Sequence, residues 1–166
     1  MGESGEDDGS IGVAVVSVSA DRSLDEDPPG AAIRSELEES GYEVVTREVI
    51  EEKYDNVQGT VDRLVRRDDV ALIVTNGGTG VRPDETTIEA IRSLTWRDLP
   101  GFGERFRRYW GEEVGVEVIG DRSTAGIIDD TPIFCLPGDE RAARFGTSQI
   151  IIPVARDLIG ALESDQ

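Results

Sequence analysis

The chain contains no histidine and a single cysteine, Cys135, among its 166 residues. Without histidine, Ser-His-Asp and Cys-His catalysis and every histidine-ligated metal site are excluded. One cysteine forms neither a disulfide framework nor a thiolate zinc site within one chain. Cys135 sits in the apolar run 133–136, so we interpret it as a buried structural residue rather than a nucleophile. This cysteine usage indicates a cytoplasmic protein.

Long apolar runs are also missing. No stretch approaches the roughly 18 apolar residues that a transmembrane helix needs, so we expect no membrane span. Residues 1–10 are acidic and glycine-rich, and they lack the basic start and apolar centre of a signal peptide. We expect a disordered acidic tail at 1–10, followed by a single domain at 11–163.

Positive charge is scarce. The chain has 17 basic residues against 35 acidic ones, a formal net charge of −18, and Lys53 is its only lysine. Such a field repels nucleic acid, which disfavours a DNA- or RNA-binding role. Acidic pairs recur along the whole sequence, and we interpret them as a halophilic adaptation because strong salt screens their repulsion. Unfolding at low salt would support this hypothesis, and stability independent of salt would contradict it.

The most informative stretch is an apolar run at 70–74 that ends in a glycine cluster, Gly77, Gly78 and Gly80. The run predicts a buried, central, parallel strand. The glycines allow positive φ and a close backbone approach by a ligand, and successive free N–H groups form an anion site. A helix carrying Ile88 and Ile91 follows, with Thr86 or Thr87 as its N-cap.

This loop is neither a Walker A motif nor a dinucleotide fingerprint, because both spacings are absent. The alternative is a tight strand-to-helix turn whose glycines serve geometry alone. We favour a ligand site, because ligands of open parallel sheets bind at the carboxyl ends of strands.

The rest of the chain alternates strand and helix patterns, which predicts an α/β fold in three layers, with a mostly parallel sheet and helices on both faces. We expect strands at 11–18, 42–50 (nearer an edge) and 131–136, a short strand at 114–119, and a polar connection at 120–130. Expected helices begin near 28, 56, 100, 140 and 150. An aromatic stripe at Phe102, Phe106, Tyr109 and Trp110 predicts core or subunit packing. In the last helix we expect Ile151, Val154, Leu158 and Leu162 to face inward.

With these pieces in order, the chain resembles the molybdopterin-binding family of molybdenum-cofactor biosynthesis, the MoaB/Mog type. The resemblance covers about residues 11–162. It rests on short segments that follow the family's order: 16–22 (Val-Ser-Val-Ser-Ala-Asp-Arg), 75–80 (Thr-Asn-Gly-Gly-Thr-Gly) with 87–89, 100–104 (Pro-Gly-Phe-Gly-Glu), 123–126 (Ser-Thr-Ala-Gly) and 136–138 (Leu-Pro-Gly).

The resemblance implies binding of molybdopterin and transfer of AMP from MgATP to its phosphate, a molybdopterin adenylyltransferase activity. It also implies a homotrimer or hexamer, a downstream metal-insertion protein as partner, and molybdenum or tungsten as the metal served. The implied ligand-binding residues are Ser17, Ser19, Asp21, Thr75, Asn76, Gly77, Gly78, Thr79, Gly80, Ser123, Gly126, Pro137, Gly138 and Asp139.

Glu51, Asp84 and Glu85 are the candidate catalytic and Mg²⁺-binding residues, since Mg²⁺ takes few carboxylates together with phosphate oxygens. The family's Asp after the glycine loop aligns with Glu85, and its second functional Asp aligns with Glu51. Either Asp84 or Glu85 can take the first role.

Two alternatives stay open, a non-catalytic molybdopterin-binding carrier and a nucleotide-binding domain for another small anion. Nine arginines fall between Arg82 and Arg144. They could serve an anionic ligand, although pairing with nearby acids explains most of them.

Overall fold

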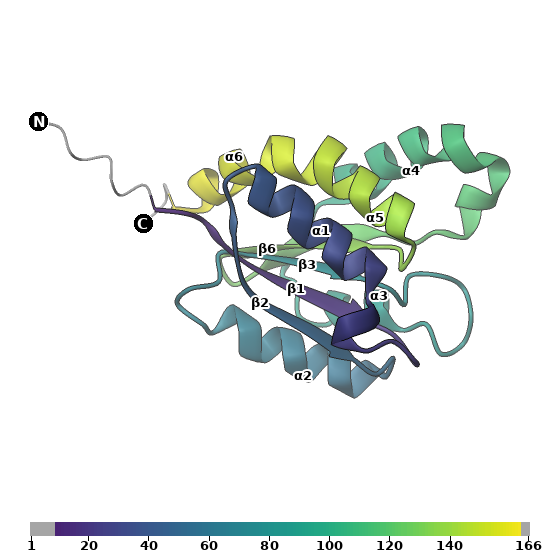
Figure 1. The fold of residues 1–166 in the computed structure, drawn as a ribbon, viewed down its shortest axis with the longest axis horizontal. Coiled ribbons are helices and arrows are strands. Elements are labelled where there is room, and N and C mark those ends of the chain that lie inside the picture. Colours follow the sequence, from purple (N-terminus) through teal and green to yellow (C-terminus); the bar gives the residue numbers. More distant parts are fainter. Residues whose placement is uncertain (1–8, 164–166) are drawn as a thin grey trace, which may run out of the picture.

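The computed structural model describes residues 9–163. Within this range one sheet has the strand order β2-β1-β3-β6-β5-β4, and helices cover both of its faces (Figure 1). The strands are β1 (Gly12–Val18), β2 (Glu43–Ile50), β3 (Leu72–Asn76), β4 (Arg97–Asp98), β5 (Thr124–Ile128) and β6 (Thr131–Leu136). Most of the expected acidic tail, residues 1–8, lies outside the described residues.

The helices are α1 (Pro28–Glu39), α2 (Tyr54–Val65), α3 (Thr87–Arg92), α4 (Pro100–Val114), α5 (Glu140–Gly146) and α6 (Ile152–Glu163). Short 3₁₀ segments, η2 (Leu24–Glu26) and η3 (Gly115–Gly120), and a π-helical segment, η4 (Thr147–Ile151), complete the chain. No helix within residues 9–163 is long and apolar enough to cross a membrane.

β2, β1, β3 and β6 run parallel, whereas β5 pairs antiparallel with both β6 and β4. The predicted three-layer α/β fold with a mostly parallel sheet is therefore confirmed. The expected central position of β3 and the edge position of β2 are confirmed as well.

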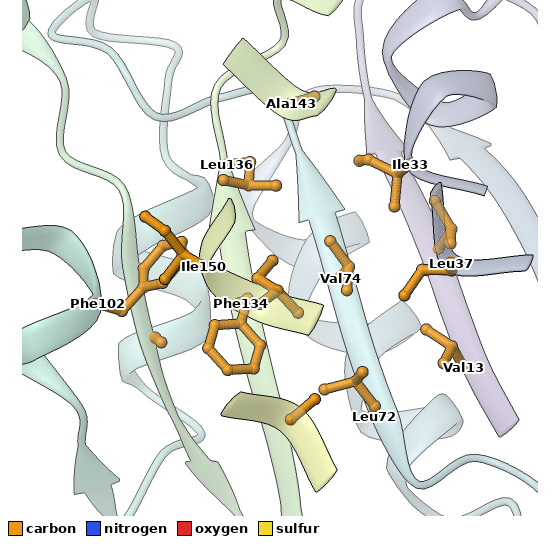
Figure 2. Packing of buried hydrophobic residues seen from close by; sticks show 14 of the residues in the cluster. Val13, Ile33, Leu37, Leu72, Val74, Phe102, Phe134, Leu136, Ala143 and Ile150 are labelled. Atoms are coloured by element: carbon orange, nitrogen blue, oxygen red, sulfur yellow. The ribbon is translucent and has the colours of Figure 1, made fainter. Parts of the chain in front are cut away.

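The core has two layers because successive strand side chains point to opposite faces. On one face Val13, Leu72 and Val74 pack with Phe134 and with residues of α1, α4, α5 and α6 (Figure 2). On the other face Ile73 and Cys135 pack against α2 and α3. Cys135 is buried, as predicted, and burial raises the pKa of its thiol to about 12, which keeps the thiol neutral.

The polar connection expected at 120–130 is wrong, because β5 occupies Thr124–Ile128 and is buried along its whole length. Thr-Ala-Gly at its start has weak strand propensity, so the local pattern did not reveal it. Its position is set by tertiary packing. A Cβ on Gly126 would lie 2.8 Å from Thr95 Cγ2 and 2.9 Å from the Arg97 carbonyl oxygen, so glycine lets the edge strand β4 come close.

The strand expected at 114–119 is also wrong. The alternation of Val114, Val116 and Val118 resembles a strand, but Gly115 adopts φ 78°, which ends α4 and starts a 3₁₀ turn. No neighbouring strand in the described sheet offers it an edge, and Val116 and Ile119 are 81% exposed.

The aromatic stripe of α4 belongs to the core of one chain. Phe102, Phe106 and Trp110 are buried, and the Phe102 and Phe134 rings lie 5.1 Å apart in an edge-to-face pair. Core packing is therefore confirmed for three of the four predicted aromatic residues, and the fourth, Tyr109, is half-buried and lies 6.3 Å from the Phe145 ring.

The inward face of the last helix differs from the prediction. Ile151 is buried as expected, but Ala155 and Ile159 complete the buried row, while Val154 is 38% exposed and Leu158 and Leu162 are half-buried. α5, η4 and α6 follow one another directly, and the π-helical turn shifts the phase of the pattern. Pro153 lies in the first turn of α6, as expected.

Candidate functional site

A cleft of about 640 Å³ opens at the carboxyl ends of β1, β3 and β6. Part of its lining comes from the 77–86 connection, which projects from the end of the sheet at the right of Figure 1. Its walls are formed by Val18, Ser19, Ala20, Asp21, Arg22, Pro28, Pro29, Glu52, Gly77, Gly78, Arg82, Asp84, Glu85, Gly138 and Glu140. The sequence predicted a ligand site at this edge.

The glycine loop has the geometry that the sequence predicted at two of its three glycines. Gly77 adopts φ 98° and Gly78 adopts φ 72°. A Cβ on Gly77 would lie 2.1 Å from the Val18 carbonyl oxygen, and one on Gly78 would lie 2.0 Å from Thr87 Oγ1. Both positions therefore require glycine to bring the loop against β1 and α3.

Gly80 makes room for a carboxylate instead. The Glu85 side chain accepts hydrogen bonds from the Gly80 N–H at 2.9 Å and the Arg82 N–H at 3.2 Å, so it closes the loop on itself. Thr86 is the N-cap residue of α3, as expected, but its side chain makes no capping hydrogen bond. Thr87 Oγ1 is buried with no hydrogen-bond partner within residues 9–163.

At the end of β2 the structure brings Glu52 into the cleft and leaves Glu51 out. Glu51 pairs with Lys53 at 3.3 Å and borders a separate hollow beside α2. The chain turns sharply here, with the Lys53 N–H donating to the Glu51 carbonyl oxygen, so consecutive side chains diverge. The family resemblance aligned Glu51 with the functional acid at the end of the second strand, but it is the next residue, Glu52, that lines the cleft.

The remaining predicted binding residues separate into three groups. Ser19, Asp21, Gly77, Gly78 and Gly138 line the cleft. A second hollow of about 320 Å³, on the other side of the glycine loop, is bordered by Thr79, Gly80, Pro137, Gly138 and Asp139. Ser17, Thr75, Asn76, Ser123 and Gly126 are buried and line neither hollow.

Comparison with known proteins shows which family has this fold and this glycine loop. Residues 14–157 match the model of a family described as "Probable molybdopterin binding domain". The chain belongs to this molybdopterin-binding family. The expected family and its fold are thereby confirmed.

Individual relatives agree with the family over nearly the whole chain. "Molybdenum cofactor biosynthesis protein B" of Halalkalibacterium halodurans is 36% identical over 140 residues, which cover 84% of this chain and 82% of that protein. A crystal structure of a protein of the same name superposes with a TM-score of 0.90 at 28% identity, covering 94% of this chain and 98% of the other. The tungsten cofactor synthesizing protein MoaB of Pyrococcus furiosus superposes at 0.82 with 30% identity, covering 92% and 97%.

Within this family site, the sequence analysis did not single out Arg22, Arg82 and Glu140, all of which line the cleft. Arg22 belongs to the first family segment and Arg82 to the glycine loop, so proximity in the sequence could have indicated both. Of the other eight arginines between 92 and 144, four form ion pairs with acids within residues 9–163, so pairing explains half of them: Arg107 with Asp121, Arg122 with Glu89, Arg141 with Glu113, and Arg144 with Glu36.

Arg122 also holds the glycine loop from outside. Its Nε donates to the Gly80 carbonyl oxygen at 2.9 Å and its Nη2 to the Glu85 carbonyl oxygen at 3.0 Å. The loop is thus fixed from both sides, which suits a site that binds without rearrangement.

The cleft carboxylates influence one another. Burial raises the pKa of Glu52 above its usual value, and the charges of Asp84 and Glu85 raise it further, against the opposing influence of Arg82 and Arg22. A ligand-free cleft therefore carries excess negative charge, which a cation would neutralise.

This pKa shift makes a prediction about stability. Glu52→Gln is expected to raise the unfolding temperature at pH 7 and to leave it unchanged well below the ordinary value of 4.5. A carboxyl group with a raised folded-state pKa contributes stability at low pH, and this contribution is lost as the pH rises through that pKa. Thermal unfolding of wild type, Glu52→Gln and the control Glu51→Gln in molar salt at both pH values tests this. An equal gain at both pH values would contradict it.

The donor set also bears on magnesium. Within residues 9–163 no three acidic, cysteine or histidine side chains are grouped to hold a metal ion by themselves. The trio Glu51, Asp84 and Glu85 therefore forms no ready-made metal cage. Glu52 and Asp84 at the cleft wall do suit Mg²⁺, because this ion binds through one or two carboxylates together with substrate phosphates.

Proposed function

We propose that this protein binds molybdopterin in the cleft and transfers AMP from MgATP to its phosphate. The observation that carries the proposal is the glycine loop, held at positive φ at a strand terminus, with Arg22, Arg82, Glu52 and Asp84 around it. The expected run of free loop N–H groups is wrong, because the N–H groups of Gly77, Gly80 and Arg82 donate to Leu136 and Glu85. The site instead presents guanidinium groups and a close backbone approach to phosphates, and carboxylates to a divalent cation. Family membership supports the pterin ligand.

The reaction needs no nucleophile from the protein, in keeping with a chain that lacks histidine. An oxygen of the pterin phosphate attacks the α-phosphorus of ATP. The bond from that phosphorus to the oxygen bridging to the β-phosphate breaks, and pyrophosphate leaves with the electron pair. The protein's contribution is to hold both phosphates in line and to neutralise the developing charge.

Each cleft residue has a part in this scheme. The missing Cβ atoms of Gly77 and Gly78 let phosphate oxygens approach the loop backbone closely, although the Gly77 N–H itself donates to the Leu136 carbonyl oxygen at 2.9 Å. Arg22 and Arg82 offset the phosphate charge. Glu52 and Asp84 would hold Mg²⁺, which supplies charge neutralisation on the phosphates when bound. Glu85 keeps the loop closed through Gly80 and Arg82.

The direct test incubates the protein with molybdopterin and MgATP in molar salt and measures adenylylated pterin and pyrophosphate. Equal amounts of the two products, dependent on Mg²⁺, are expected. Pterin binding with no AMP transfer at any salt or Mg²⁺ concentration would favour the alternative, a non-catalytic molybdopterin carrier of the same pathway. Molybdenum and tungsten are both compatible with the proposal, because one relative is named for tungsten cofactor synthesis.

We further propose a cytoplasmic homotrimer or hexamer that passes its product to a metal-insertion protein. The family resemblance supports the assembly, and light scattering in molar salt should show three or six chains. A monomer under those conditions would contradict it. Low salt is unsuitable for this measurement, because a net charge of −18 per chain drives subunits apart.

A further inference from the structure

A buried carboxylate lies behind the cleft and has no part in the scheme above. The Asp27 side chain is 1% exposed, at the start of α1. It accepts hydrogen bonds from Ser17 Oγ at 2.6 Å, the Gly30 N–H at 3.3 Å, Arg22 Nη1 at 3.3 Å and Arg47 Nη2 at 3.1 Å. Four donors fix the position of this buried carboxylate.

These contacts form part of a closed ring. Arg22 also donates through Nη2 to Asn76 Oδ1 at 3.4 Å, and Asn76 Nδ2 donates to Ser17 Oγ at 2.8 Å. Ser17, Asp27, Arg22 and Asn76 thus connect the ends of β1 and β3 with the start of α1. Ser17 and Asn76 were expected to touch ligand, but they are buried and support this ring instead.

The ring leaves Arg22 at the cleft surface. Arg22 lines the cleft beside Gly77 and Gly138, and a Cβ on Gly138 would lie 3.3 Å from its Nη2. A guanidinium has five N–H donors, and within the described residues the hydrogen bonds of Arg22 to Asp27 and Asn76 use two of them. Arg22 and Arg47 both pair with the single carboxylate of Asp27, so the cluster of these three side chains retains a positive charge next to the cleft.

We propose that Asp27 is a positioning residue that fixes Arg22 on the cleft floor and thereby sets the affinity for the ligand's phosphates. The proposal for Asp27 rests on the proposed function in one respect only, namely that the ligand of the cleft carries a phosphate. Asp27 itself does not line the cleft, so it acts through Arg22.

Anchoring matters because the cleft wall is acidic. Glu52 and Asp84 line the same cleft as Arg22 and would attract an unanchored guanidinium. Replacing Asp27 by a neutral amide also leaves Arg22 and Arg47 facing each other without a counterion, which drives the more exposed Arg22 outward. A displaced Arg22 would then occupy the carboxylates that we assign to Mg²⁺.

The test is a double-mutant cycle read by calorimetric binding of MgATP and Mg-pyrophosphate in molar salt. Asp27→Asn is expected to raise the Kd about tenfold, the scale of one lost charge-assisted contact. In an Arg22→Ala background the same change should add less than twofold, although it still lowers the unfolding temperature. Val61→Ala, in the core on the other face of the sheet, is the control for lost stability without a lost anchor.

Equal effects of Asp27→Asn in both backgrounds, or an unchanged or lower Kd in the folded single variant, would overturn the proposal. If Asp27→Asn does not fold, Asn76→Ala removes the other anchor of Arg22 without changing the charge and should weaken binding in the same direction. A crystal structure of the ligand-free Asp27→Asn protein distinguishes failure of this proposal from failure of the proposed function. If Arg22 is displaced in that structure but the wild type binds no phosphate compound, Asp27 does position Arg22 and the proposed function is rejected. If Arg22 has not moved, the positioning role of Asp27 is rejected.

Discussion

Asp84→Asn is expected to lower the rate of AMP transfer by about 100- to 1,000-fold, the usual cost of removing one group that stabilises transition-state charge. Molybdopterin affinity should change little, because Asp84 is assigned to the metal-bound phosphates rather than to the pterin. Asp84 lines the cleft, whereas both oxygens of Glu85 are engaged by the Gly80 and Arg82 N–H groups. Single-turnover rates and pterin binding, measured separately over a range of Mg²⁺ concentrations, test the assignment.

Three companion variants sharpen this experiment. Glu52→Gln should resemble Asp84→Asn, while Glu51→Gln, one residue away but outside the cleft, should behave as wild type. Glu85→Gln should weaken binding and rate together, since it loosens the loop. A rate loss confined to Glu85→Gln would transfer the metal-binding role to Glu85, and a loss with Glu51→Gln would refute the placement of Glu52.

Gly77→Ala is expected to abolish molybdopterin binding and to lower the free energy of unfolding by about 2–4 kcal/mol, a range typical of strain combined with a backbone clash. Two causes act together: φ is 98°, and the new Cβ would lie 2.1 Å from the Val18 carbonyl oxygen. A backbone atom cannot move aside as a side chain can. Denaturant unfolding and pterin binding in molar salt measure both effects.

Gly59→Ala provides the matched control. Gly59 lies within α2, and nothing lies within 4 Å of a Cβ added there. Alanine should stabilise this helix by about 0.5–1 kcal/mol and leave binding unchanged. A Gly77→Ala protein as stable as wild type would show that the loop adapts, and the argument for a fixed glycine cradle would fail.

The strands with a clear local pattern could be predicted from the sequence. β1 and β3 are apolar, β-branched runs, and their burial follows from composition alone. β5 was missed because Ala125 and Gly126 at its centre are poor strand formers, which outweighed the strand preference of Thr124 and the two isoleucines after them. Pairing with β4 and β6 on both sides fixes the strand. Local propensity is a weak guide where pairing partners decide the conformation.

The site shows the same division between local and long-range information. The glycine loop could be predicted from residue type, because few residues other than glycine tolerate positive φ. The selection of Glu52 over Glu51 depends on the direction of a turn after β2, which no residue pattern records. Arg22 reaches its place through Asp27 and Asn76, and a contact across 54 positions of sequence is not visible in a single chain.

The direction of the parallel strands has a practical consequence. β1 begins, and α6 ends, at the side of the sheet opposite the 77–86 connection (Figure 1). A surface tether, fluorescent label or second enzyme joined near Gly12 or Glu163 would therefore extend away from the cleft. The protein is therefore suited to immobilisation near Gly12 or Glu163, because the cleft then stays accessible to small molecules from the solvent.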